Sequence, residues 1–134
     1  MSLSDYPRMI GLWKRTPGIG LSDADSESNI ERFLEHNPGL CFVSESDGRL
    51  IGTVLCGHDA RRGYLYHLAV DERWRKQGIG GELAARSLEE LQRLGIGRCH
   101  LFLYDDNSTA MTFYEKTGWR RRKNLLIYSK DLLP

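Results

Sequence analysis

The chain has few cysteines, and those it has show no paired spacing. Cys41, Cys56 and Cys99 each lie in an apolar, strand-like run. This pattern predicts buried free thiols in a reducing compartment and argues against a disulfide scaffold. The four histidines are scattered along the chain, so the sequence offers no clustered ligand set for a zinc ion. We expect no bound metal.

Long apolar runs and an excess of charge are absent as well. No stretch is long and apolar enough to span a bilayer, and the N-terminus lacks a signal-peptide pattern. With 19 Lys and Arg against 18 Asp and Glu, the net charge is +1, so no strong field favours nucleic acid or a membrane surface as a partner. We expect a cytoplasmic protein, and 134 residues predict a single domain, 1–134.

The most informative stretch is 63–95. Residues 64–70 form a nearly continuous apolar run, which is typical of a strand covered on both faces. Apolar residues then recur at helical spacing from Ile79 to Leu94. The basic loop between strand and helix ends in glycines, and the N–H groups at a helix N-terminus are free to bind an anion that approaches the backbone. The stretch therefore predicts an anion site.

Three kinds of glycine-rich loop fit such a pattern to different degrees. A dinucleotide fingerprint would need a third glycine where Leu83 stands, and its gap from strand to glycine is shorter. A Walker loop would need Gly-Lys-Ser/Thr, which this sequence lacks. An ordinary strand-to-helix loop, with glycines that only relieve crowding, remains open on these residues alone.

The rest of the chain predicts one α/β domain. An Asp-Gly pair at Asp47 and Gly48 lies between two apolar runs, which indicates a hairpin. The expected strands are 40–45, 50–56, 64–70, 99–104 and 125–130, and the expected helices are 4–15, 26–36, 79–94 and 107–117. The helical crossover from 79 makes the strand at 99 parallel to the central strand, so the sheet is mixed.

Two segments resemble the GNAT superfamily of acyl-CoA N-acyltransferases, in its bacterial single-domain form. The stretch from Arg75 to Gly80 matches the family signature Arg/Gln-x-x-Gly-x-Gly/Ala after the central strand. The pattern Asn107-x-x-Ala-x-x-x-Tyr114-x-x-x-Gly-Trp resembles the later segment that runs from a strand into a helix. The resemblance implies an α/β fold with a central mixed sheet flanked by helices. The family's first strand is expected to be missing or truncated here.

The resemblance also implies the chemistry. The chain is expected to move an acetyl group from acetyl-CoA, its co-substrate, to a primary amine of a small molecule or protein by direct attack through a tetrahedral intermediate. The backbone of Leu68 and Val70 would hold the pantetheine and thioester, Asn107 would bind the pantetheine, and Tyr114 would meet the leaving thiolate. The residues expected around the CoA phosphates are Arg75, Lys76, Gln77, Gly78, Ile79, Gly80 and Gly81.

The general base is the least defined part of this hypothesis. Tyr64 and Tyr66 stand where many GNAT enzymes have a carboxylate or histidine, and either could line the acceptor pocket or order a water. Strand alternation places His67 on the opposite face, which favours a packed core histidine. We therefore expect no single indispensable base on this strand. The missing carboxylate leaves open a non-catalytic acyl-CoA-binding sensor or regulatory module, and a homodimer also remains open.

Overall fold

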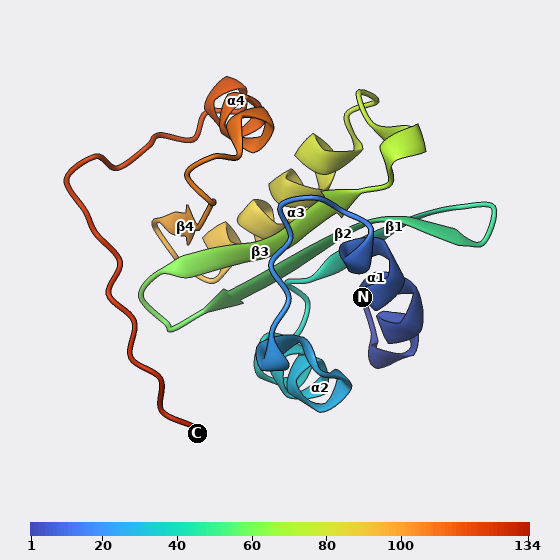
Figure 1. The fold of residues 1–134 in the computed structure, drawn as a ribbon, viewed down its shortest axis with the longest axis horizontal. Coiled ribbons are helices and arrows are strands. Elements are labelled where there is room, and N and C mark those ends of the chain that lie inside the picture. The colour runs from blue at the N-terminus through green and yellow to red at the C-terminus, as the bar shows by residue number, and fades with distance from the viewer. The chain divides into compact units, whose positions relative to one another are not determined.

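The structure is a computed structural model that describes residues 1–134. The chain divides into two compact units, Met1–Tyr104 and Asp105–Pro134, and each is described by itself. Figure 1 shows the order of the elements along the chain. None of the helices combines the length and the apolar character that a membrane crossing requires.

The first unit holds a four-stranded sheet and three α-helices. Its elements are the short 3-10 helices η1 (Leu3–Asp5), η2 (Asp23–Asp25) and η3 (Glu72–Trp74), the helices α1 (Tyr6–Lys14), α2 (Glu27–His36) and α3 (Ile79–Arg93), and the strands β1 (Phe42–Ser46), β2 (Arg49–His58), β3 (Gly63–Val70) and β4 (Cys99–Leu101). The strand order is β1-β2-β3-β4. Within residues 1–134, only helices precede β1.

The pairing of the strands confirms the predicted mixed sheet. β1 and β2 are antiparallel, β2 and β3 are antiparallel, and β3 and β4 are parallel. The hairpin between β1 and β2 turns at Asp47 and Gly48, whose φ angles of 50° and 74° are the left-handed values that a tight hairpin turn needs. The crossover from β3 to β4 passes through α3, as a parallel connection requires.

β3 carries a bulge that the sequence did not predict. Leu55 pairs with Tyr66 and Thr53 pairs with Ala69, so two residues of β3, His67 and Leu68, stand opposite one residue of β2. His67 has a φ of +49°. A bulge inserts one residue into the alternation and shifts the side chains that follow to the other face.

The bulge overturns the predicted face of His67. The His67 ring packs on Trp13 of α1, with 4.7 Å between ring centroids, and Tyr66 meets Phe33 of α2 at 6.2 Å. Both side chains therefore lie on the face of the sheet that α1 and α2 cover. The prediction of opposite faces was wrong because it assumed a regular strand.

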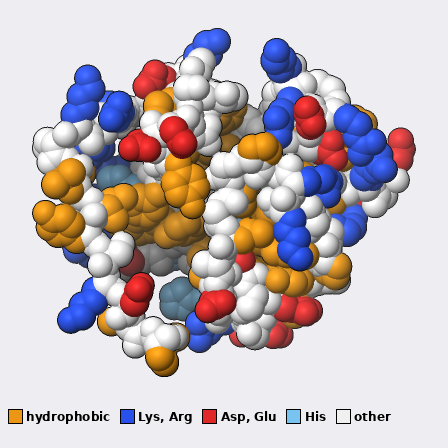
Figure 2. All heavy atoms as spheres, viewed as in Figure 1, with side chains coloured by type: hydrophobic (Ala, Val, Ile, Leu, Met, Phe, Trp, Pro, Cys, Tyr) orange, Lys and Arg blue, Asp and Glu red, His pale blue; other side chains and the backbone are white.

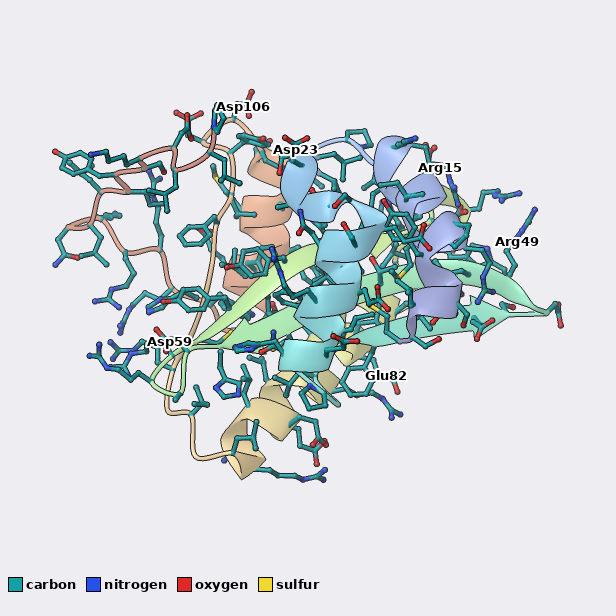
Figure 3. All side chains as sticks on the ribbon, turned by 90° about the horizontal axis from the view of Figure 1, so that it is seen from below. Arg15, Asp23, Arg49, Asp59, Glu82 and Asp106 are labelled. Carbon is teal, nitrogen blue, oxygen red and sulfur yellow. The ribbon has the colours of Figure 1, made fainter.

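Helices cover both faces of the sheet (Figure 3), with Asp23 on the side of α2 and Glu82 on the side of α3. On the first side, α1 and α2 bury an apolar cluster against the sheet that includes Met9, Leu12, Trp13, Ile30, Leu55 and Ala69. On the second side, α3 lies so close to β3 that a Cβ added at Gly63 would stand 2.5 Å from a methyl carbon of Leu91. This close approach explains a glycine at the start of the strand.

The cysteines are free, as predicted. The Cys56 N–H donates to the Cys41 sulfur at 3.3 Å, and the Cys41 thiol donates to the Cys56 carbonyl at 3.4 Å. Burial raises the pKa of Cys41 and Cys99 to about 11 and that of Cys56 to about 12. All three thiols therefore remain protonated at neutral pH.

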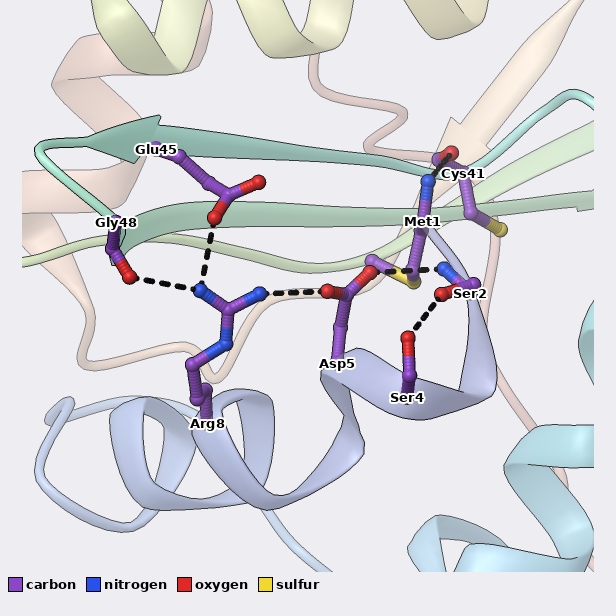
Figure 4. Close-up of polar contacts among 8 residues, drawn as sticks. All are labelled: Met1, Ser2, Ser4, Asp5, Arg8, Cys41, Glu45 and Gly48. Atoms are coloured by element: carbon purple, nitrogen blue, oxygen red, sulfur yellow. Dashed lines mark hydrogen bonds and ion pairs between the residues drawn. The ribbon is translucent and has the colours of Figure 1, made fainter.

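Polar contacts tie the start of the chain to the β1–β2 hairpin (Figure 4). The Arg8 guanidinium donates to Glu45 at 2.8 Å and to the Gly48 carbonyl at 3.1 Å, and it pairs with Asp5 at 2.7 Å. Burial opposes the ionisation of Asp5, but hydrogen bonds from the Ser2 N–H and from Arg8 hold the pKa of Asp5 below its usual value. These contacts fix α1, which supplies one wall of the core.

The second unit contains α4 (Ser108–Lys116) and a C-terminal segment without helix or strand. The predicted closing strand at 125–130 is absent: Leu126 is 83% exposed and Tyr128 is 91% exposed. An apolar run supplies strand propensity, but a strand also needs ladder hydrogen bonds to a partner. The strand predicted at 99–104 is also shorter and ends at Leu101.

Candidate active site

The central feature of the site is an open edge of β3. Only Gly63, Tyr64 and Leu65 pair with β4, so the two strands separate after Leu65. The Asp71 N–H donates to the Ile51 carbonyl at 2.7 Å. Because successive residues of an antiparallel strand turn their N–H groups to opposite edges, the Val70 N–H points away from β2. The main chain at Val70 therefore faces the edge of β3 from which β4 has separated.

The second feature is the N-terminus of α3. The first hydrogen bond of the helix runs from the Glu82 N–H to the Gly78 carbonyl at 3.0 Å, so the N–H groups of Ile79, Gly80 and Gly81 have no helical partner. Gly78 caps the helix with a φ of 82°, a left-handed value that favours glycine. These donors and the helix dipole would favour an anion at the start of α3, which follows β3 after η3 and a short turn.

Gly81 has no packing reason to be glycine. A Cβ added at Gly81 would meet no atom within 4 Å, yet glycine costs about 1 kcal/mol relative to alanine inside a helix. A bare backbone at this place is what a closely approaching phosphate requires. The residues present therefore fit the pyrophosphate of a CoA-type substrate.

Two basic residues flank this anion site. The Arg75 Nε donates to the Val70 carbonyl at 3.1 Å, so the side chain folds back along the loop and links the end of β3 to the start of α3. Lys76 is exposed and has a φ of 62°. Both residues lie in the loop that joins the two parts of the site, which is where the sequence placed them.

A row of aromatic rings lies beside the open edge. Tyr64 stacks on Tyr66 with 6.5 Å between ring centroids and on Phe102 at 6.3 Å. Tyr66 and Phe102 are exposed, and Figure 2 shows apolar side chains at the surface over β3. Burial and the neighbouring Tyr64 raise the pKa of Tyr66, so its phenol is neutral at neutral pH. The row is a suitable wall for an acceptor.

In the second unit, α4 holds the other two predicted site residues. Asn107 caps the helix, because its Oδ1 accepts the Ala110 N–H at 3.1 Å. Tyr114 lies two turns further along, edge-on to Phe113 at 5.0 Å and to Trp119 at 5.6 Å. Burial raises the pKa of Tyr114 to about 12, so the phenol is a hydrogen-bond donor over the whole physiological range.

The sequence model of the acetyltransferase (GNAT) family matches residues 6–119. The chain belongs to the GNAT acetyltransferase family. Among curated relatives, an acetyltransferase of Photorhabdus laumondii is 34% identical, with 96% of this chain and 90% of that protein covered. An acetyltransferase of Sodalis glossinidius is 32% identical over the same shares of the two chains. An acetyltransferase of Pectobacterium atrosepticum is 36% identical, with 84% and 79% covered.

Solved structures share the GNAT fold with this chain. The PaiA N-acetyltransferase of Thermoplasma acidophilum, in complex with coenzyme A, has a TM-score of 0.78 at 22% identity and covers 90% of this chain and 86% of its own. The aminoglycoside acetyltransferase AAC(6')-Iy, in complex with a bisubstrate analogue, has a TM-score of 0.77 at 18% identity, with 98% and 95% covered. These likenesses confirm the predicted α/β fold.

The sequence missed one polar network of this GNAT domain. His67 contacts Asp25 of η2, with 2.6 Å between His67 Nε2 and Asp25 Oδ1. The Trp13 indole donates to the Thr53 hydroxyl, and that hydroxyl donates to the His67 carbonyl, both at 2.9 Å. Asp25 lies 42 residues before His67 in the sequence, in the short 3-10 helix η2, so only the fold brings the two together.

Asp71, the residue after β3, holds the GNAT loop in place. Its carboxylate accepts the Arg73 N–H at 3.0 Å and the Arg15 guanidinium at 3.2 Å, and it is buried. The backbone hydrogen bond from Arg73 lowers the pKa of Asp71 to about 2, with help from the Arg73 and Arg15 side chains and against the opposing effect of burial. Ionised Asp71 therefore stabilises the fold above pH 4.

Replacing Asp71 by Asn should lower the free energy of unfolding at pH 7 by about 1 kcal/mol, after allowance for the exposed arginine partners. A lowered pKa gives stability that is present above the unfolded value near 4 and is lost as the pH falls toward 2. The difference between wild type and variant should therefore shrink at pH 2.5. Urea unfolding at both pH values measures it, with the exposed Asp23→Asn as control. If wild type and Asp71→Asn differed by the same free energy of unfolding at pH 7 and at pH 2.5, ionised Asp71 would not be the source of the stability.

Proposed function

We propose that residues 1–134 form a single acetyltransferase domain that moves the acetyl group of acetyl-CoA to a primary amine of a small molecule or protein. The proposal rests on three features that follow one another within the segment 63–81: an open strand edge, a glycine-rich loop and helix N–H groups without a helical partner. The strand edge suits a pantetheine arm that adds as an extra strand, and the helix N-terminus suits a pyrophosphate.

Each proposed role uses a group that the structure leaves available. The backbone from Gln77 to Gly81 binds the pyrophosphate, with Arg75 and Lys76 beside it. The Leu68 main chain binds the pantetheine, and the Val70 N–H stabilises the oxyanion of the tetrahedral intermediate. The Val70 role is supported by the direction of its N–H, which points away from β2.

The second unit supplies two further groups. The Asn107 Oδ1 is used in the helix cap, so its NH₂ group is the part assigned to the pantetheine. Tyr114 is the donor to the leaving thiolate. The relatives named as acetyltransferases favour this enzyme over a non-catalytic acyl-CoA-binding module. The three free thiols suit a reducing cytoplasm, which is the location we propose.

The test is a screen of amines and peptides with acetyl-CoA, with release of free CoA thiol as the signal. Turnover of at least one amine, with the acetylated product identified by mass spectrometry, is the expected result. Aminoglycosides belong in the panel because two different aminoglycoside acetyltransferases are among the proteins with similar structures. Tight CoA binding without turnover of any amine would instead favour the binding module.

Replacing Tyr64 or Tyr66 by Phe should lower kcat/KM for the amine by less than about tenfold, because each change removes one hydroxyl of the acceptor wall and keeps the ring. Steady-state kinetics on the best amine of the panel would measure the effect. KM for acetyl-CoA should stay unchanged. A loss of a thousandfold or more in either variant would make that hydroxyl part of the chemistry.

A further inference from the structure

The loop between α1 and η2 runs along the part of β3 that no longer pairs with β4. Just before the loop, the Arg15 guanidinium donates to Asp71 at 3.2 Å, at the end of β3. Just after it, Asp25 contacts His67 of β3 at 2.6 Å. These two anchors hold the loop across the face of β3, and Figure 1 shows it passing over the strand. We call its uncharged residues, 16–22, the strap.

The middle of the strap touches the segment that leaves β4. A Cβ added at Gly20 would overlap the phenol oxygen of Tyr104 and would stand 3.1 Å from the ring carbon that carries this oxygen. Gly20 does not have a positive φ, so packing and not backbone conformation explains the glycine. The contact bridges the gap that opens between β3 and β4 after Leu65.

The aromatic row of Tyr64, Tyr66 and Phe102 lies on the same face of the sheet as the strap. Tyr66 meets Phe33 of α2, which defines the face, and the other two rings of the row continue the stack from Tyr66. Tyr66, Phe102 and Tyr104 are all exposed. Large apolar side chains that gather at a protein surface commonly mark a binding site. The strap and the row thus form two walls of one apolar surface beside the open edge.

Neither wall carries a charged side chain. The strap reads Thr-Pro-Gly-Ile-Gly-Leu-Ser, and the row consists of tyrosine and phenylalanine. The carboxylates at the two ends of the strap are already paired, Asp71 with Arg15 and Asp25 with the Ser22 N–H. A polycationic acceptor would need several free carboxylates. Aromatic faces suit a flat ring that stacks on them and a single ammonium group beside them.

We propose that the acceptor is a small primary amine on an aromatic body, an arylalkylamine, and that the strap and the aromatic row select it. The inference rests on the proposed function and narrows its acceptor class. The ring of the acceptor stacks beside Tyr66, and its aliphatic arm extends along β3 toward the thioester at Val70. Tyr104, resting on Gly20, encloses the acceptor between the two walls.

The length of the strand sets the length of the arm. Tyr66 and Val70 are four residues apart, and because one of these is the extra residue of the bulge, they are separated by about 10 Å at 3.3 Å per residue. The arm shares this distance with the thioester carbonyl, which extends from the Val70 N–H toward the amine. A two-carbon arm is therefore the expected length.

The experiment compares kcat/KM for four amines in the full chain at saturating acetyl-CoA. The amines are 2-phenylethylamine, 2-cyclohexylethylamine, whose ring has the same size but is not flat, ethanolamine, which has no ring, and kanamycin, a polycationic aminoglycoside. Tyr66→Leu removes the flat ring from the row and keeps an apolar side chain, whereas Tyr66→Phe keeps the ring and is its control. Ratios between amines cancel a general loss of activity, and calorimetry with CoA shows that each variant is folded.

We expect 2-phenylethylamine to exceed ethanolamine by about a hundredfold, because its ring leaves water. It should exceed 2-cyclohexylethylamine by about threefold to tenfold, because only a flat ring stacks well. Tyr66→Leu should abolish this second preference and Tyr66→Phe should retain it. Equal preference in wild type and Tyr66→Leu, or kanamycin or ethanolamine as the best amine, would overturn the inference and leave the proposed function standing. A wild type that turns over no amine would overturn the proposed function as well.

The contact between strap and Tyr104 has a test of its own. In Gly20→Ala the new methyl group displaces the exposed Tyr104 ring, so kcat/KM for 2-phenylethylamine should fall about tenfold with little change for ethanolamine. Tyr104→Phe removes the overlapping oxygen, so adding it to Gly20→Ala should restore most of the loss. Gly97→Ala is the control, because a Cβ there meets no atom within 4 Å.

Equal losses for both amines in Gly20→Ala would reduce this contact to a structural role and contradict the selection of the acceptor by the strap. Sedimentation of each variant tests the other occupant of such a surface, a second copy of the chain. A wild-type dimer that Gly20→Ala or Tyr66→Leu dissociates, without a change in the ratios between amines, would assign the apolar surface to self-association and overturn the inference.

Discussion

Replacing Tyr114 by Phe is expected to lower kcat by tenfold to a thousandfold while leaving the affinity for acetyl-CoA close to that of the wild type. The substitution keeps the ring that packs on Phe113 and Trp119 and removes only the hydroxyl. In the proposed role the hydroxyl acts on a charge that develops only as the C–S bond breaks, so its loss should affect the transition state and leave the bound substrate unchanged.

The raised pKa of Tyr114 specifies how the hydroxyl acts. With a phenol pKa of about 12 and a thiol pKa near 8.5, full transfer of the proton to the thiolate is uphill by about 5 kcal/mol. We therefore expect Tyr114 to donate a hydrogen bond and keep its proton, with the sulfur taking its proton from the attacking amine. Activity should accordingly show no ionisation of Tyr114 below about pH 11.

The matched control is Tyr128→Phe, which removes the hydroxyl of a tyrosine exposed in the C-terminal segment. It should leave kcat unchanged. Single-turnover kinetics with saturating acetyl-CoA would separate the chemical step from product release. Wild-type turnover in Tyr114→Phe would reduce this residue to a packing role.

Replacing Gly80 by Val should abolish CoA binding and leave the domain folded. Gly80 lies in the first turn of α3, and its N–H is one of the donors without a helical partner. A branched side chain there would fill the space that a pyrophosphate needs against the backbone. Valine has a higher helix propensity than glycine, so the helix itself is not weakened. Calorimetry with CoA measures the affinity, and circular dichroism monitors the fold.

Gly97→Val is the control for this change. A Cβ at Gly97 would meet no atom within 4 Å, and the residue lies after the end of α3, away from its N-terminus. The same substitution there should leave CoA affinity unaltered. If the Gly80→Val variant bound CoA as tightly as the wild type, the 77–81 backbone would not be the binding site of the pyrophosphate.

Local signals in the sequence account for most of the fold. The Asp47-Gly48 turn, the period of apolar residues from Ile79 onward and the glycines around Gly78 each depend on a few neighbouring residues, and the hairpin and α3 are confirmed. The assignment of these residues to CoA rests on the family pattern and on available N–H groups, and it stays a prediction.

Features that depend on contacts between residues far apart in the sequence could not be predicted from local patterns. The bulge at His67 depends on how β2 and β3 pair, and no local pattern in 63–70 marks it. Asp25 meets His67 only because the fold carries η2 to the sheet. In the segment 125–130 the sequence predicted a strand that the structure lacks. Its residues favour a strand, but propensity does not supply the partner strand that a ladder needs.

The protonated state of the three cysteines makes the protein a convenient platform for site-specific labelling. With pKa values of about 11 to 12, at most about one thiol in a thousand is ionised at pH 8, and the thiolate is the form that reacts with maleimides and disulfide reagents. Thiol reagents would thus report CoA release with little background from the enzyme. A single new cysteine at an exposed position could carry a fluorophore while Cys41, Cys56 and Cys99 stay in place.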